Sequence, residues 1–274
     1  MRSLTFWLVT LLFSVSAWAT EAFSEEPIAL NNITVRICGT TAYPPVSWIT
    51  PGGRVEGVNA MIVHALLKPL GISVDDQQDS NWQRCLKEVE LGNVDIMTGF
   101  RNEVRSEYMV FLETPIVRED INLFYPASKP LVFNDWEGLS GKRVGVLMGD
   151  SFGDRVDSAL AKYLRLEWVS SQRQNLLKLA DHRLDAVPMG KLSGQLLINA
   201  FGLTGQIDSV ATDVSDYWYV AISKRSPLMQ WLPRLNSELK ALLSDPKLIP
   251  LWMKQQRSMY LQSTAEETSG QDIP

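Results

Sequence analysis

The segment NWQRCLKEVELGNVDIMTGFRNEVRSEYMVF, residues Asn81 to Phe111, combines a helix, a stop signal, a buried strand and a polar loop. Its first ten residues place apolar side chains at i, i+3, i+4 and i+7, the spacing of one helix face: Trp82, Cys85, Leu86 and Val89. Gly92 and Asn93 then supply the flexible backbone that commonly ends a helix. Residues 94–97 are short and apolar, which predicts a buried strand.

The residues that follow this strand form the first candidate binding site. Thr98, Gly99 and Phe100 are predicted just past its carboxyl end, and Arg105 in the loop beyond. In open α/β sheets, ligands bind at that edge. A hydroxyl, backbone amides and a guanidinium suit a carboxylate there, because Arg presents a rigid two-pronged donor fork. We therefore predict a carboxylate-binding site centred on Arg105.

The first nineteen residues have the pattern of a secretory signal peptide. Arg2 precedes an apolar run over residues 4–15, and Ser16 to Ala19 ends it with small residues at cleavage-type positions. The alternative is a transmembrane helix, which needs roughly 20 apolar residues. The run is shorter than that, so the sequence favours export with cleavage after Ala19.

Composition restricts the class of partner and cofactor. The chain has a net charge of −5, and removal of Arg2 with the signal peptide would make it −6. This mild acidity argues against a nucleic-acid partner, which favours a basic patch. With two cysteines and two histidines, His64 and His182, the chain cannot assemble a zinc site. No other cofactor is predicted, and the mature length suits one large core or two lobes.

The two cysteines, Cys38 and Cys85, are expected to pair. An even pair in an exported protein favours a disulfide. Cys38 ends a predicted strand and Cys85 faces inward from the helix, so a helix crossing over that strand would bring them within bridging range. Two buried free thiols remain the alternative, because Cys also serves as a small core residue.

The order of predicted elements indicates an α/β fold. The first half alternates strands 33–38, 72–76 and 94–97 with helices 59–67 and 82–92, which implies a parallel sheet with right-handed crossovers. Residues 116–125 form a predicted crossing segment. The pattern restarts with strands 143–147, 166–169, 184–188 and 207–211 and helices 152–163, 172–182 and 192–200. Residues 217–223 form a second predicted crossing segment, which leads back to the first half. Helices 227–243 and 246–256 follow, and the polar tail 263–274 is predicted to be disordered.

Several motifs, each weak alone, occur in an order that resembles the extracytoplasmic solute-binding proteins of family 3. The first half contributes Tyr43-Pro44-Pro45, Gly57 before a helix, Trp82 with the helix end at Gly92, Val94-Asp95, and Arg105 six residues before Phe111. The second half contributes Gly141-Lys142-Arg143-Val144-Gly145-Val146, Gly149-Asp150-Ser151, Leu184-Asp185-Ala186-Val187, and Ser226-Pro227. The resemblance covers roughly residues 31–258.

The resemblance implies a periplasmic protein, expected to be a monomer, whose two lobes close on a solute and deliver it to the permease of an ABC transporter. Lobe I would comprise residues 31–125 and 218–262, and lobe II residues 126–217, joined by two crossing strands. Arg105 would clamp the ligand carboxylate, with Tyr43 as one wall. Thr98, Gly99, Phe100 and Ser151 would add hydroxyl and backbone donors, and Ser151 at a helix start would favour an anion. Trp48, in the same loop as Tyr43, is expected either in this site or capping the core.

Two positions depart from the family pattern. The acidic residue that pairs with the ammonium group in amino-acid binders is replaced by Gly190, and the one before the first-loop tyrosine by Thr40. A buried ammonium without a counter-charge costs several kcal/mol. An α-amino acid ligand would therefore need a substitute, for which Asp150, Asp213 and Asp216 are candidates.

Three functions fit the sequence. The first is a transport receptor for a small carboxylate-bearing solute. The second is a periplasmic dehydratase of the cyclohexadienyl type, which shares this scaffold but needs a paired general acid and base. The sequence contains no evident pair of that kind, so we expect a binding protein rather than an enzyme. The third is a sensory ligand-binding subunit that docks on a membrane receptor.

Overall fold

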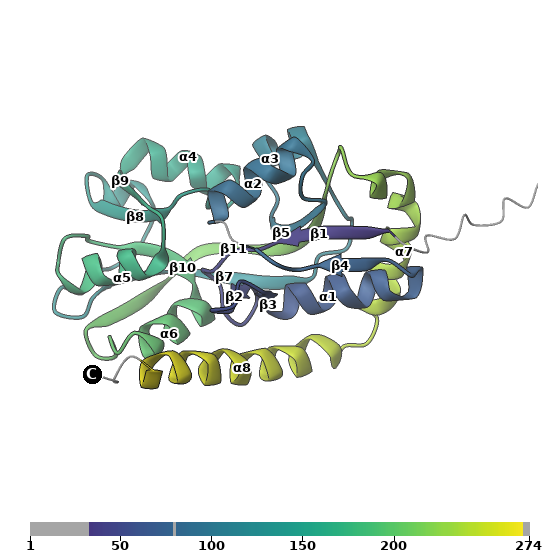
Figure 1. The fold of residues 1–274 in the computed structure, drawn as a ribbon. Coiled ribbons are helices and arrows are strands. Elements are labelled where there is room, and N and C mark those ends of the chain that lie inside the picture. Colours follow the sequence, from purple (N-terminus) through teal and green to yellow (C-terminus); the bar gives the residue numbers. More distant parts are fainter. Residues whose placement is uncertain (1–32, 79–80, 271–274) are drawn as a thin grey trace, which may run out of the picture.

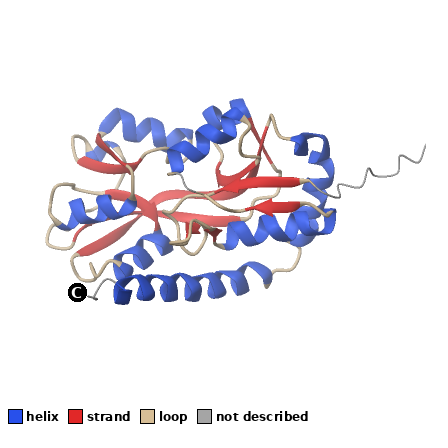
Figure 2. Ribbon diagram, in the orientation of Figure 1, coloured by secondary structure: helices blue, strands red, loops and turns tan. Residues whose placement is uncertain are grey.

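The computed structural model describes residues 33–78 and 81–270. The predicted signal peptide lies outside these residues. Within them, no helix combines the length and apolar character needed to cross a membrane. Helices lie on both sides of a central layer of strands (Figure 2), which confirms the predicted α/β class.

The first lobe is built on three parallel strands in the order β4-β1-β5: β1 (Thr34–Cys38), β4 (Ser73–Asp75) and β5 (Ile96–Phe100). Its helices are α1 (Val58–Leu67), α2 (Trp82–Leu91) and α3 (Glu103–Tyr108), with the 3-10 turn η1 (Lys68–Leu70) after α1. A small hairpin joins β2 (Trp48–Ile49) to β3 (Val55–Glu56), and β6 (Met109–Phe111) follows α3. The predicted parallel arrangement is therefore present.

Helix α2 has the boundaries that the sequence predicts. The side chain of Asn81 accepts a hydrogen bond from the Arg84 amide at 2.9 Å, which caps the first turn. Gly92 ends the helix in the left-handed conformation, with φ of 83°. Cys85, buried on the inner face of α2, forms the predicted disulfide with Cys38 at the end of β1.

Two long antiparallel strands connect the lobes: β7 (Val117–Pro126) and β11 (Ile207–Ser223). The sheet order is β10-β7-β11-β5-β1-β4, and β6 also pairs with β11, so one mixed sheet reaches from the first lobe into the second. The sequence predicts two strands where the structure has β11 alone. A register irregularity between Ala211 and Ser215 marks the polar stretch that separated them in the prediction.

The second lobe repeats the alternation of strands and helices. It contains η2 (Glu137–Leu139), β8 (Arg143–Leu147), α4 (Asp154–Tyr163), β9 (Arg165–Val169), α5 (Gln172–Ala180), β10 (Val187–Gly190) and α6 (Lys191–Ala200). β8 and β9 are parallel, and a bridge from Val144 to Ala186 connects them to the segment before β10. Strand β10 begins later than the predicted strand 184–188, because its pairing with β7 runs from Val187 to Gly190.

The chain ends with η3 (Pro227–Trp231), α7 (Leu232–Leu242) and the long α8 (Leu248–Gly270). Helix α8 lies along α1 and reaches α6 of the second lobe (Figure 1). Trp252 and Met253 pack against the core of the first lobe, whereas Tyr260 belongs to the apolar cluster of the second. The structure thus differs from the predicted helix end near Gln256 and from the predicted disorder of 263–270. Residues 271–274 lie outside the described residues.

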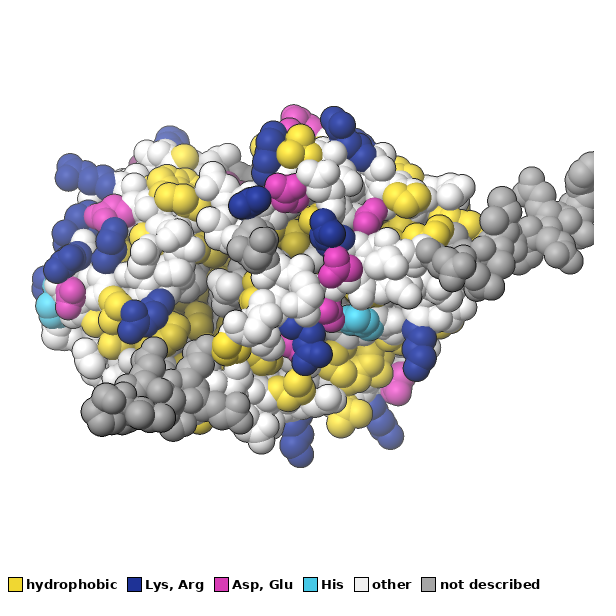
Figure 3. Space-filling view, in the orientation of Figure 1, with side chains coloured by type: hydrophobic (Ala, Val, Ile, Leu, Met, Phe, Trp, Pro, Cys, Tyr) yellow, Lys and Arg dark blue, Asp and Glu magenta, His cyan; other side chains and the backbone are white. Residues whose placement is uncertain are grey.

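Side chains of both charge signs are interspersed on the face shown in Figure 3. Among the described residues, several charged side chains form exposed pairs, such as Arg155 with Asp213 at 3.0 Å and Arg118 with Asp120 at 3.1 Å. Exposed pairs of this kind contribute little to stability because water screens them.

Candidate functional site

A small cavity lies where the first loop of lobe II meets β5 and α3 of lobe I. Nine residues line it: Thr40, Tyr43, Trp82, Gly99, Phe100, Arg105, Asp150, Ser151 and Trp218. Its volume is about 10 Å³, which holds roughly one water molecule. The lobes are therefore closed on each other, and a solute can enter only if they separate.

Arg105 is held inside this interface by its local backbone. It lies in the short helix α3, where the Arg105 backbone amide donates a hydrogen bond to Asn102 Oδ1 at 2.8 Å. The guanidinium Nη1 donates to the Phe100 carbonyl at 2.7 Å, and Nη2 donates to the Gly149 carbonyl at 2.8 Å. The guanidinium carbon lies 5.5 Å from the ring centre of Trp82.

The Arg105 charge is buried without a direct ion pair. The residue is 4% exposed, and no described carboxylate lies within ion-pair distance of it. Gly99 makes this close packing possible, because a Cβ there would lie 3.3 Å from Nη1. Burial lowers the pKa of Arg105, and the nearby Asp150 partly offsets that effect. Two carbonyl oxygens accept hydrogen bonds from the guanidinium, so it has donors in use but no carboxylate in direct contact.

Asp150 brings a carboxylate of lobe II into the cavity. The Tyr43 hydroxyl donates to Asp150 Oδ2 at 3.3 Å. Burial raises the pKa of Asp150 to about 7, although the positive charge of Arg105 and the Tyr43 hydrogen bond act in the opposite direction. Burial and the negative charge of Asp150 raise the pKa of Tyr43 well above its usual value, so Tyr43 remains a hydrogen-bond donor at neutral pH.

Aromatic rings form the apolar wall of the cavity. The rings of Tyr43 and Phe100 each lie 5.1 Å from that of Trp218, and 6.4 Å from each other. These separations are typical of tilted and edge-to-face ring pairs. The three rings therefore stabilise one another by packing and form a continuous apolar side of the cavity.

Three further hydrogen bonds join the lobes around the cavity. The indole Nε1 of Trp82 donates to the Gly149 carbonyl at 3.1 Å. Asn102 Nδ2 donates to Ser151 Oγ at 2.8 Å, and the amide of Glu103 donates to the Asp154 carboxylate at 3.2 Å. The loop from Gly149 to Asp154 is thus bonded to lobe I along its length.

The structure brings five predicted site residues together: Tyr43, Gly99, Phe100, Arg105 and Ser151. Their local setting differs from the prediction, because Thr98, Gly99 and Phe100 lie within β5 rather than past its end, and Arg105 is helical. Ser151 precedes α4 by three residues instead of starting it. Its hydroxyl donates to Asp157 Oδ2 at 2.5 Å.

Two predicted site residues lie elsewhere. Thr98 lines a separate internal cavity of about 10 Å³ that also includes Cys38 and Asn59. Trp48 packs against Tyr260 of α8 at 5.4 Å between ring centres, and its indole donates to Gln256 Oε1 at 3.0 Å. The structure thus favours the core-capping alternative for Trp48.

Sequence reasoning missed Asn102 and Trp218. Asn102 stands three residues before Arg105 and has the side chain of a helix cap, so the sequence did contain a signal for it. Trp218 reaches the cavity through the pairing of β11 with β5, where it is the partner of Phe100. No local pattern indicates a contact between residues so far apart in the chain.

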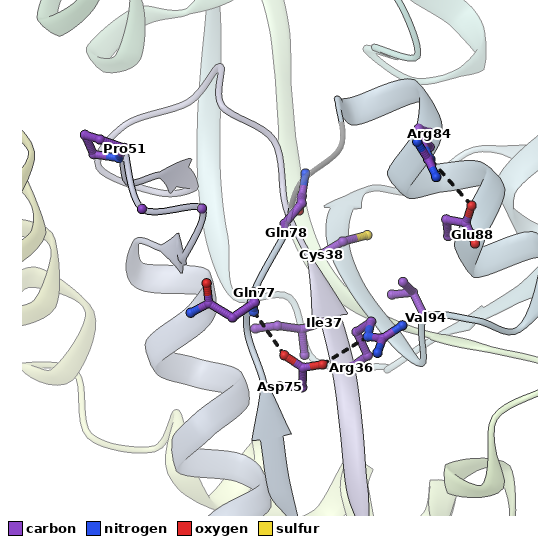
Figure 4. A pocket seen from close by; sticks show the side chains of 12 residues that line it. Arg36, Ile37, Cys38, Pro51, Asp75, Gln77, Gln78, Arg84, Glu88 and Val94 are labelled. Atoms are coloured by element: carbon purple, nitrogen blue, oxygen red, sulfur yellow. Dashed lines mark hydrogen bonds and ion pairs between the residues drawn. The ribbon is translucent and has the colours of Figure 1, made fainter.

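A larger depression of about 800 Å³ lies on lobe I beside Cys38 (Figure 4). Its charged residues are paired with each other: Arg36 with Asp75 at 3.0 Å, and Arg84 with Glu88 at 3.7 Å. The depression therefore offers no uncompensated charge to a ligand. Among the described residues, no group of three or more His, Cys, Asp or Glu could hold a metal ion.

Residues 35–251 match the model of the bacterial extracellular solute-binding proteins, family 3. The match covers most of the chain, so the chain belongs to this family, which confirms the resemblance drawn from the sequence. No curated protein matches the chain significantly.

Solved structures share the two-lobed fold at low sequence identity. The substrate-binding protein of an amino acid ABC transporter has a TM-score of 0.67 and 16% identity, covering 81% of this chain and 99% of its own. An ancestral arginine-binding protein bound to arginine has a TM-score of 0.67 and 18% identity, covering 80% and 97%. A histidine kinase sensor domain has a TM-score of 0.67 and 19% identity, covering 83% and 96%. These likenesses confirm the predicted fold class.

Proposed function

We propose that the protein binds a small carboxylate-bearing solute between its lobes in the periplasm and delivers it to the membrane permease of an ABC transporter. The observation that carries this proposal is the buried guanidinium of Arg105, which has two carbonyl partners and no ion pair with a described carboxylate. A solute carboxylate would form the direct ion pair that Arg105 lacks and would use the donor geometry of the guanidinium.

The two carbonyl bonds of Arg105 suggest how binding proceeds. Phe100 belongs to lobe I, so its bond to Nη1 persists when the lobes separate and keeps the guanidinium oriented. Gly149 belongs to lobe II, so its bond to Nη2 breaks on opening. The solute carboxylate then accepts a hydrogen bond from Nη2, and the loop that contains Gly149 and Ser151 closes over the solute. This exchange requires no rearrangement within lobe I.

Relatives of this fold support an amino-acid-like solute. One structural neighbour is the binding protein of an amino acid transporter, and another binds arginine. A neighbouring histidine kinase sensor domain supports a sensory subunit as a second candidate function. Co-purification with a permease or with a kinase would distinguish transport from sensing.

A dehydratase would need an acid and a base at the substrate. Asp150 has the raised pKa of a general acid, but its partner Tyr43 is held protonated at neutral pH, so the two do not form an acid–base pair. We therefore propose binding without catalysis. Measurable turnover of a prephenate-type substrate would contradict this.

The experiment that tests the proposal is native mass spectrometry of freshly purified protein, followed by thermal shifts with amino acids and simple carboxylates. A solute at 100 times its dissociation constant should add about 2.7 kcal/mol to the free energy of unfolding. Arg105→Gln should abolish that shift, and Arg105→Lys, which keeps the charge but loses the fork, should reduce it.

The matched control is Arg101→Gln, which removes an exposed guanidinium four residues earlier in the chain. It should leave the shift intact. Equal shifts in the Arg105→Gln and wild-type proteins would refute the role of Arg105, and the absence of any shift across the panel would refute solute binding.

A further inference from the structure

Glu119 is a buried carboxylate beside the cavity that the site described above does not use. It lies on the crossing strand β7 and is 5% exposed. One hydrogen bond reaches it, from the indole Nε1 of Trp218 to Oε2 at 3.4 Å. Within the described residues no Lys, Arg or His lies within ion-pair distance of it. The fold therefore buries a negative group and leaves it without a positive partner.

Glu119 occupies the space that a side chain at position 190 would fill. A Cβ built on Gly190 would overlap the Glu119 carboxylate, with its Cδ at 2.6 Å and Cγ at 3.1 Å. The backbone of Gly190, with φ of −54° and ψ of 133°, is open to any residue. The glycine is thus required by the close approach of Glu119 and not by its own conformation.

The charges around the cavity are unbalanced. Arg105 is the only cation among the nine lining residues, and Asp150 is the carboxylate that acts most strongly on it. Glu119 adds a second negative group, close enough to Tyr43 to help raise the pKa of its hydroxyl. Burial raises the pKa of Glu119 itself to about 7. Once a solute carboxylate binds Arg105, three acidic groups, those of Asp150, Glu119 and the solute, surround one cation.

We propose that Glu119 is the counter-charge for an ammonium group of the bound solute, so that the site selects amine-bearing carboxylates over their deaminated analogues. This inference rests on the proposed function. The free energy of the buried carboxylate would be lowered by a protonated amine, which donates to Glu119 and packs against the rings of Tyr43 and Trp218.

Asp150 is the alternative partner for an amine. It already accepts a hydrogen bond from the Tyr43 hydroxyl and lies near the positive charge of Arg105, so its negative charge is partly compensated. It also moves with lobe II, whereas Glu119 lies on a strand shared by both lobes. Glu119 therefore keeps its position on the strand that joins the lobes, whereas Asp150 reaches lobe I only when the loop of lobe II is closed.

The test compares L-amino acids with their α-deaminated carboxylates: alanine with propionate, glutamate with glutarate, phenylalanine with hydrocinnamate, and arginine with guanidinopentanoate. Isothermal titration should show that the wild-type protein binds one amino acid at least about 30-fold tighter than its deaminated analogue. Glu119→Gln should remove that preference without weakening the analogue. Asp120→Asn, which neutralises the exposed neighbouring carboxylate, should leave it unchanged.

Two further measurements cover the case in which Glu119 is needed for folding. Without added solute, Glu119→Gln should melt higher than the wild-type protein at pH 8, because the variant no longer buries an unpaired charge; a much lower melt would assign Glu119 a purely structural role. Should Glu119→Gln fail to fold, the double variant Glu119→Ala with Gly190→Asp projects a carboxylate into the same space and should prefer amines. A double variant without that preference would overturn the proposal.

The outcomes separate this inference from the proposed function. Equal binding of both members of every pair by the wild-type protein would overturn the role of Glu119 and leave carboxylate binding at Arg105 intact. The role of Glu119 is also overturned if Asp150→Asn, rather than Glu119→Gln, removes the preference for amines. Wild-type protein that binds no member of any pair would overturn both proposals.

Discussion

Gly149 packs directly against the first lobe when the lobes are closed. Its φ is +88°, and a Cβ there would lie 3.2 Å from side-chain atoms of Leu86 and Trp82 and 3.3 Å from the Cα of Gln83. Its carbonyl also accepts hydrogen bonds from Trp82 and Arg105. We predict that Gly149→Ala destabilises the closed arrangement specifically.

The magnitude has two parts. Alanine in the left-handed region costs roughly 1–2 kcal/mol whether the lobes are open or closed. The added methyl group then crowds the lobe interface, and overpacking of this kind costs about 1–3 kcal/mol in the closed form alone. That second part corresponds to a shift of roughly 5- to 150-fold toward the open form.

Gly141→Ala is the matched control for Gly149→Ala. Gly141 has a similar φ of +76°, but nothing lies within 4 Å of a Cβ built on it. Gly141→Ala therefore has the free-energy cost of alanine in the left-handed region, but its methyl group does not crowd the lobe interface. Small-angle scattering should show a larger radius of gyration for Gly149→Ala than for Gly141→Ala, and solute binding should weaken only in the former. Identical radii and identical affinities in the two variants would show that contact at Gly149 does not control closure.

Three other predictions concern stability. Replacing both Cys38 and Cys85 by Ser should cost about 4 kcal/mol in urea unfolding, because the disulfide closes a loop of 47 residues; a loss below about 1 kcal/mol would contradict this. Stability should fall as pH rises from about 5 to 8, because the folded-state pKa of Glu119 and of Asp150 is raised to about 7, so the unfolded chain binds fewer protons over that range. For Glu119, with a reference pKa of 4.5, this amounts to about 3 kcal/mol, and a flat urea midpoint between those pH values would exclude it. Tyr260→Ala should cost about 3 kcal/mol because it removes a buried ring that packs against Trp48 and the apolar cluster of the second lobe, and an unchanged thermal melt would show that this ring does not anchor α8.

Local signals predicted most of the fold. The apolar spacing of α2 and its stop at Gly92 are readable within a few residues, and the structure confirms both. The disulfide between Cys38 and Cys85 followed from two cysteines and the expected export. The end of α8 was not predictable in this way, because residues 263–270 have no apolar period that would indicate a packed helix.

The site was predictable only in part, because its contacts depend on strand pairing. Arg105 and Tyr43 follow strand ends in the sequence, so the pattern of strands and loops predicted their place. Strand β5 extends through Phe100 because it pairs with Trp218 of β11, a partner more than a hundred residues away. Glu119 faces Gly190 for the same reason, since β7 and β10 are neighbours only in the folded sheet.

A crystal structure of the protein with the solute identified by native mass spectrometry would test the role of Arg105 most directly. We predict a solute carboxylate oxygen within about 3.2 Å of Arg105 Nη2, in place of the Gly149 carbonyl, while Nη1 still donates to Phe100. A solute bound elsewhere, with Nη2 still bonded to Gly149, would contradict this prediction.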